Sequence, residues 1–161
     1  MASDSPKTSS LPGSLGAKVL VGAVALAAPL VMYYEGKVNR VYVDPVQILT
    51  SCYGHTGPEL KPGQVFTDQQ CLEQLGEDLA EANDGVNACI KAPLTDNQRA
   101  ALISFTFNVG QGQLCKSTLA RKANAGLPFC AELSKWTFAG GRQLPGLVKR
   151  REAERRLCEA K

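Results

Sequence analysis

The chain has 161 residues, of which 44% are hydrophobic and 20% are charged, and its formal net charge at pH 7 is +3. A chain of this length and composition forms one globular domain with an ample core, which can be divided into two lobes. So small a net charge gives no support for nucleic-acid binding, and we expect no nucleic-acid partner. It is compatible with an anionic target such as a cell wall or a membrane surface.

The first notable feature along the chain is an apolar run, because no charged residue occurs from Val19 to Tyr34. Its length lies between that of a signal-peptide core and that of a membrane-spanning helix. The run is rich in Ala and Gly and contains Pro29, so it is weakly hydrophobic for a permanent anchor. Three interpretations remain open: a signal peptide cleaved near Ala25-Leu26-Ala27, a permanent anchor, and an uncleaved anchor that can leave the membrane.

The stretch that follows carries Glu35, then Asp44 nine residues later and Thr50 six residues after that. β-Branched and aromatic residues on both sides of Asp44-Pro45 predict a β-hairpin with its turn there. Glycoside hydrolysis needs one protonated carboxyl, which helps the leaving oxygen depart, and one ionised carboxyl, which positions water or a nucleophile. These residues supply such groups. The alternative is that Glu35 caps an element and Asp44 only opens the turn.

The remaining elements are predicted to be mainly helical. Capping boxes at Thr67 and Thr95 mark the starts of two helices, the first of which should run to about Asn83. The second contains 101–109, which is apolar nearly all round, as expected of a buried central helix, and Gly110 should end it. Further helices are expected at 117–125, 128–136 and 145–158, with a third short strand near 64–66.

Six cysteines form an even set within the body of the chain. They are Cys52, Cys71, Cys89, Cys115, Cys130 and Cys158. No Cys-x-x-Cys pair occurs and His55 is the sole histidine, so the spacing does not suggest zinc, and we predict no metal site. Three disulfides are the better interpretation, which places the body of the protein in an oxidising compartment. The alternative is six reduced thiols in a cytosolic protein.

The order Glu35, Asp44, Thr50, followed by a Gly-His turn, resembles the active-site stretch of the phage-type lysozymes. The sequences FNVGQG at 107–112 and WTFAGGRQLPGLVKRREAE at 136–154 fit the same family. Within it, the chain is most similar to the endolysins of lambdoid phages that carry an N-terminal signal-arrest-release segment. The resemblance covers nearly everything outside the first thirty residues.

This resemblance implies an α+β fold of two lobes, a small one with an antiparallel hairpin sheet and a larger helical one around the buried central helix. Residues 1–34 would form the signal-arrest-release segment and residues 35–161 the catalytic domain. The expected reaction is hydrolysis of the β-1,4 bond between N-acetylmuramic acid and N-acetylglucosamine in peptidoglycan. Glu35 would be the general acid, while Asp44 and Thr50 would orient the attacking water.

The resemblance also makes Phe107 and Asn108 candidates for lining the substrate cleft, and it implies no metal or organic cofactor. The expected partners are peptidoglycan and, before release, the periplasmic face of the host inner membrane. After release the protein would be a monomer in the periplasm. Two alternatives are a lytic transglycosylase, which the presence of Asp44 and Thr50 disfavours, and a non-catalytic wall-binding protein on the same scaffold.

Cross-links and ion pairs can be predicted within such a fold. We expect His55 to be structural and to pair with a carboxylate of the next helix, such as Asp78. The basic residues of the last helix either form a solvated face or include one, best assigned to Arg150, that forms a salt bridge near the active site. The expected disulfides are Cys52–Cys71 between hairpin and lobe-linking helix, Cys130–Cys158 between the last two helices, and Cys89–Cys115.

Overall fold

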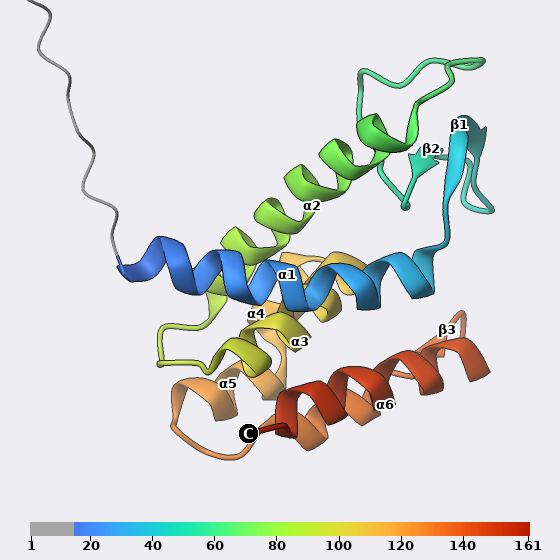
Figure 1. Ribbon diagram of the computed structural model, residues 1–161. Helices are drawn as coiled ribbons and strands as arrows, with labels where there is room; N and C mark the ends of the chain where they lie inside the picture. The colour runs from blue at the N-terminus through green and yellow to red at the C-terminus, as the bar shows by residue number, and fades with distance from the viewer. Residues whose placement is uncertain (1–14) are drawn as a thin grey trace, which may run out of the picture.

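The computed structural model describes residues 15–161, and residues 1–14 lie outside the described part. Figure 1 shows a small lobe that holds the strand pair β1 and β2, a larger helical lobe, and the long helix α2 running between them. The predicted two-lobed α+β fold is confirmed. The elements are α1 (Leu15–Glu35), β1 (Val38–Val43), β2 (Leu49–Cys52), α2 (Asp68–Cys89), α3 (Asp96–Val109), α4 (Gln111–Lys116), α5 (Thr118–Asn124), the 3-10 helix η1 (Cys130–Lys135), β3 (Phe138–Ala139), β4 (Arg142–Gln143) and α6 (Pro145–Glu159).

Helix α3 is the buried centre of the larger lobe, as predicted. Thr95 and Gln98 form a capping box at its start, and all residues from 100 to 106 are buried. Helices α1, α2, α4 and α6 pack around it. It ends at Gly110, whose φ of 86° lies in the left-handed region that glycine adopts without strain.

Helix α1 lies across the larger lobe and packs along α3 (Figure 1). Ala23, Ala27 and Val31 recur at intervals of one helical turn and are completely buried. Ala25 and Pro29, on another face of the helix, are exposed. No helix in the part of the chain that the structure describes is both long enough and apolar enough to cross a membrane.

Helix α2 begins at its predicted capping box but extends beyond Asn83 to Cys89. The run of Asn, Asp and Gly at 83–85 has low helix propensity, which is why the sequence pointed to an end there. Gly85 is buried, and a Cβ at this position would lie 3.2 Å from side-chain atoms of Thr106 and Gln111. Close packing against α3 and the start of α4 therefore continues the helix despite its weak local propensity.

Other local predictions were wrong. The segment near 64–66 contributes only an isolated bridge between Val65 and Arg40, not a third strand. The helix expected at 128–136 is the six-residue η1, and Phe129 provides no side-chain cap at its start. Gly110 does end α3, but α4 follows it directly, and the small β3–β4 hairpin was not predicted.

All three disulfides form in the predicted pairs, and none of the six cysteines is free. Cys52–Cys71 joins β2 to α2, Cys89–Cys115 joins the end of α2 to α4, and Cys130–Cys158 joins η1 to α6. The bonded residues are 19, 26 and 28 positions apart in sequence. Each bond is expected to stabilise the fold by roughly 2–4 kcal/mol, mainly by restricting the unfolded chain.

His55 ties the small lobe to α2, as predicted. Its Nδ1 lies 2.9 Å from Asp78 Oδ2, and its Nε2 lies 2.6 Å from Glu59 Oε1. Burial disfavours the charged imidazolium, but the hydrogen bonds and charges of Glu59 and Asp78 outweigh it, so the pKa of His55 is raised above its usual 6.5. Burial raises the pKa of Asp78, and the charge and hydrogen bond of His55 partly offset that rise.

Because folded His55 holds its proton more tightly than unfolded His55, it stabilises the protein fully below about pH 6.5, the unfolded value. That contribution should be lost as the pH rises through the folded pKa. His55→Asn should therefore lower the free energy of unfolding by roughly 1–3 kcal/mol at about pH 6, and by less at about pH 8. Urea unfolding of both proteins across this window measures the difference. If His55→Asn lowers the free energy of unfolding equally at the two pH values, the raised pKa of His55 is contradicted.

Candidate active site

The β1–β2 hairpin brings three polar side chains together. Tyr42 and Thr50 stand opposite each other in the antiparallel ladder, and Asp44 follows Tyr42 by two residues, so it belongs to the same face. Thr50 is buried, and its hydroxyl donates to the carbonyl of Ile48 at 3.2 Å. The Oδ1 atom of Asp44 accepts from the amides of Val46 at 2.9 Å and Ile48 at 2.8 Å. These bonds fix the Asp44 carboxylate on the turn.

Tyr42 lies on this hairpin, where carboxylate charges act on its hydroxyl. Burial raises the pKa of Tyr42, and the negative charges of Glu35 and Asp44 raise it further. The charges of both carboxylates therefore act on this one phenol. The sequence analysis missed Tyr42, although its spacing of two from Asp44 in a predicted strand was a usable signal.

Glu35 is the last residue of α1, and its side chain is 22% exposed. Its Oε1 accepts from Arg150 Nη1 at 2.6 Å, which confirms the salt bridge predicted for Arg150. Gly54, with φ of 78°, passes so close that a Cβ on it would lie 3.0 Å from Glu35 Oε2. The end of α1, the small-lobe backbone and α6 thus meet at one carboxyl group.

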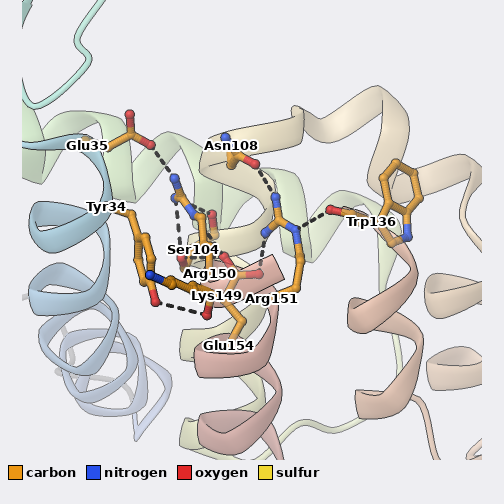
Figure 2. Close-up of polar contacts among 9 residues, drawn as sticks. All are labelled: Tyr34, Glu35, Ser104, Asn108, Trp136, Lys149, Arg150, Arg151 and Glu154. Atoms are coloured by element: carbon orange, nitrogen blue, oxygen red, sulfur yellow. Dashed lines mark hydrogen bonds and ion pairs between the residues drawn. The ribbon is translucent and has the colours of Figure 1, made fainter. Parts of the chain in front are cut away.

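A buried ionic network lies behind Glu35 (Figure 2). Arg150 and Arg151 are 4% and 1% exposed, and Glu154 is completely buried. Glu154 Oε1 accepts from Ser104 Oγ at 2.8 Å and from Arg150 Nε at 3.2 Å, while its Oε2 accepts from Arg151 Nη1. The two arginines and the carboxylates of Glu35 and Glu154 balance in charge, as buried ions require.

Arg151 extends this network from α6 to Trp136 and to Asn108 on α3. Its Nε donates to the carbonyl of Trp136 at 3.0 Å, and its Nη2 donates to Asn108 Oδ1. The guanidinium carbon lies 4.9 Å from the ring centroid of Phe105. Burial lowers the pKa of Arg151, and the charge of Glu154 opposes that shift. The sequence analysis missed Arg151 and Glu154, whose three-residue spacing on a helix was the available signal.

A polar pocket of about 280 Å³ opens between the small lobe and α3, next to Glu35. Phe107 lines it, whereas Asn108 does not, and the amide oxygen of Asn108 is occupied by Arg151. Thr106 is 4% exposed, and its hydroxyl has no hydrogen-bond partner within residues 15–161. The lining residues are Gly54, Thr56, Asp78, Glu81, Ala82, Thr106, Phe107, Gly110 and Gln111.

Curated relatives match nearly the whole chain. The SAR-endolysin of bacteriophage PS119 is 40% identical over 156 residues, which cover 92% of this chain and 93% of that protein. The SAR-endolysin of enterobacteria phage P21 is 38% identical over 157 residues, which cover 92% of this chain and 95% of the relative.

Solved structures share the fold and the two-lobed arrangement. The endolysin from Escherichia coli O157:H7 phage FAHEc1 superposes with a TM-score of 0.74 at 27% identity, covering 83% of this chain and 90% of that one. The muramidase domain of SpmX from Asticaccaulis excentricus gives a TM-score of 0.75 at 29% identity, covering 84% and 95%. The model of the family described as phage lysozyme matches residues 32–154, which include Glu35, the hairpin and the buried arginines. This chain therefore belongs to the phage lysozyme family.

Proposed function

We propose that this protein is a phage endolysin, a muramidase that hydrolyses the β-1,4 bond between N-acetylmuramic acid and N-acetylglucosamine in bacterial peptidoglycan. The observation that carries the proposal is the position of Glu35 beside Gly54, a small-lobe residue that lines the polar pocket and follows the hairpin bearing Asp44 and Thr50. The endolysins and the muramidase domain among the similar proteins support this class of reaction.

Glu35 is proposed as the general acid that protonates the leaving oxygen. Its Oε1 is held by Arg150, whereas its Oε2 lies beside Gly54, which lines the pocket. A proton on Oε2 leaves the hydrogen bond from Arg150 to Oε1 intact. The acid can therefore be protonated at the pocket side without losing the contact that orients it.

Asp44 and Thr50 are proposed to orient the attacking water. Two turn amides hold Oδ1 of Asp44, which leaves Oδ2 to accept a hydrogen bond from water. Water attack on the face opposite the leaving group inverts the anomeric centre, which requires a carboxyl separation of roughly 6.5–9.5 Å. Phe107, which lines the pocket, is proposed to contact the glycan, and Asn108, whose amide oxygen is held by Arg151, is proposed to contact it through the amide nitrogen. The proposed mechanism uses no metal or organic cofactor.

The same proposal covers location. Residues 1–34 would act as a signal-arrest-release segment that tethers the catalytic domain, residues 35–161, to the periplasmic face of the host inner membrane. The SAR-endolysins among the relatives support this assignment. With the segment in the bilayer, Glu35 at the end of α1 would be held at the membrane interface, away from its present contact with Arg150. Release would give a monomeric periplasmic enzyme with Glu35 in place.

Glu35→Gln should abolish lysis while preserving the fold, because it removes the proton donor and keeps the shape. We expect the rate to fall on the order of 10²–10⁴-fold, the usual contribution of general acid catalysis. The measurement is clearing of outer-membrane-permeabilised Gram-negative cells. Glu73→Gln, at an exposed position on α2, is the matched control and should lyse at the parent rate. Folded Glu35→Gln protein that clears cells as the parent does would refute the mechanism.

The products distinguish hydrolysis from the alternatives. Mass spectrometry of digested peptidoglycan should find ends that have gained water, and NMR of the fresh products should find an inverted anomer. Asp44→Asn should strongly slow the formation of these products. Thr50→Ala should slow it less, because this substitution removes only one of the groups that orient water. Anhydro ends would identify a lytic transglycosylase, and binding without cleavage would identify a non-catalytic wall protein.

Anchor strength should control the time of lysis. Ala25 and Pro29 are exposed on folded α1, so replacing both with Leu should strengthen the anchor without disturbing the folded enzyme. We expect more of the protein in the membrane fraction and a later onset of lysis. Depolarising the membrane should release the substituted protein less readily than the parent. Ala80→Leu, at an exposed position on α2, controls for added surface hydrophobicity. If the doubly substituted protein stays in the membrane yet lyses cells on schedule, membrane retention is not the switch.

A further inference from the structure

We propose that Glu154 is a positioning residue for Glu35 and that it acts through Arg150. The inference rests on the proposed role of Glu35 as general acid, and it assigns a function to a residue that does not touch the pocket. Glu154 is completely buried on α6, one helical turn after Arg150 (Figure 2). Within residues 15–161, the hydrogen bonds that connect it to the proposed acid pass through the Arg150 guanidinium.

Arg150 uses each of its three guanidinium nitrogens on a different partner. Nε donates to Glu154 Oε1 at 3.2 Å, Nη2 to the carbonyl of Ser104 at 3.2 Å, and Nη1 to Glu35 Oε1 at 2.6 Å. The guanidinium is planar and rigid, so the first two contacts determine the direction of the third. Glu154 and α3 together therefore set the place where Arg150 meets Glu35.

The charge of Glu154 is needed as well as its shape. Arg150 and Arg151 are adjacent and buried, and Glu154 gives one carboxylate oxygen to each of them. Without this charge, two buried guanidinium groups would depend on Glu35 alone for compensation, and a buried unpaired charge is strongly disfavoured. Arg150 would then move away from its present position, and the orientation of Glu35 would change with it.

The end of α1 has a further attachment to α6 that does not involve Glu154. The hydroxyl of Tyr34 donates to the carbonyl of Lys149 at 3.0 Å. The Cys130–Cys158 bond holds α6 to η1 one turn beyond Glu154. Loss of the Glu154 charge should therefore displace the acid without detaching α1 or α6.

The test is Glu154→Gln, which keeps the shape and removes the charge, in the full-length disulfide-bonded protein acting on purified peptidoglycan. We expect kcat to fall on the order of 10- to 100-fold, since a displacement of about 1 Å can cost as much as 10²-fold. The half-saturating substrate concentration should not change, because the pocket residues are untouched. Glu132→Gln is the matched control: Glu132 is 5% exposed, lies on η1 and pairs with Lys122 and Lys135 instead of the buried arginines, so its loss should leave kcat at the parent value.

A double-mutant cycle with Arg150→Lys tests whether the effect passes through Arg150. If it does, Arg150→Lys with Glu154→Gln has the same kcat as Arg150→Lys alone, and additive losses would overturn the proposal. If Glu154→Gln does not fold, Ser104→Ala replaces it as the test of the positioning role. It removes the hydroxyl that donates to Glu154 Oε1 at 2.8 Å, together with that hydroxyl's long 3.5 Å contact with Arg150 Nη2, and keeps the carbonyl that accepts from Arg150 Nη2 at 3.2 Å. It should lower kcat several-fold at unchanged half-saturation, and a parental kcat would overturn the proposal.

The proposed function and this inference fail in different ways. Activity retained by Glu35→Gln overturns the general-acid assignment itself. An inactive Glu35→Gln together with a parental kcat for Glu154→Gln overturns only the positioning role.

Discussion

The ion pair between Glu35 and Arg150 is the interaction on which the candidate site depends. It joins residues 115 positions apart, at the end of the first helix and inside the last. The arginine is buried, so it must be balanced, and Glu154 and the carbonyl of Ser104 complete its contacts. The candidate acid is therefore oriented by the core of the larger lobe, not by the flexible surface of a cleft.

The central helix α3 is what makes this arrangement rigid. Helix α1, which buries small side chains such as Ala23 and Ala27, packs against α3, and α6 packs against α3 as well. Its residue Ser104 contacts both Arg150 and Glu154, while Thr106 lines the pocket. Core packing and site geometry thus share the same helix, so a change in one must affect the other.

Much of the fold and of the candidate site could be predicted where the signal is local. The capping boxes at Thr67 and Thr95 placed two helix starts correctly, because a cap is satisfied within one turn. The Asp44-Pro45 turn placed the hairpin for the same reason. The extension of α2 through Gly85, the 3-10 form of η1 and the buried state of Arg151 could not be read locally, since each depends on which element packs against it.

The sequence by itself determined the order of the elements, the positions of Glu35, Asp44 and Thr50, and the cysteine set, because these follow from short-range pattern and from family motifs. Only the tertiary structure decided which groups face Glu35. Gly54 and Arg150 come from two separate segments, and their proximity to Glu35 depends on the packing of α1 and α6 against α3 and on the turn of the small lobe. No local pattern encodes such contacts, because the free energy that holds them comes from burial shared among elements distant in sequence.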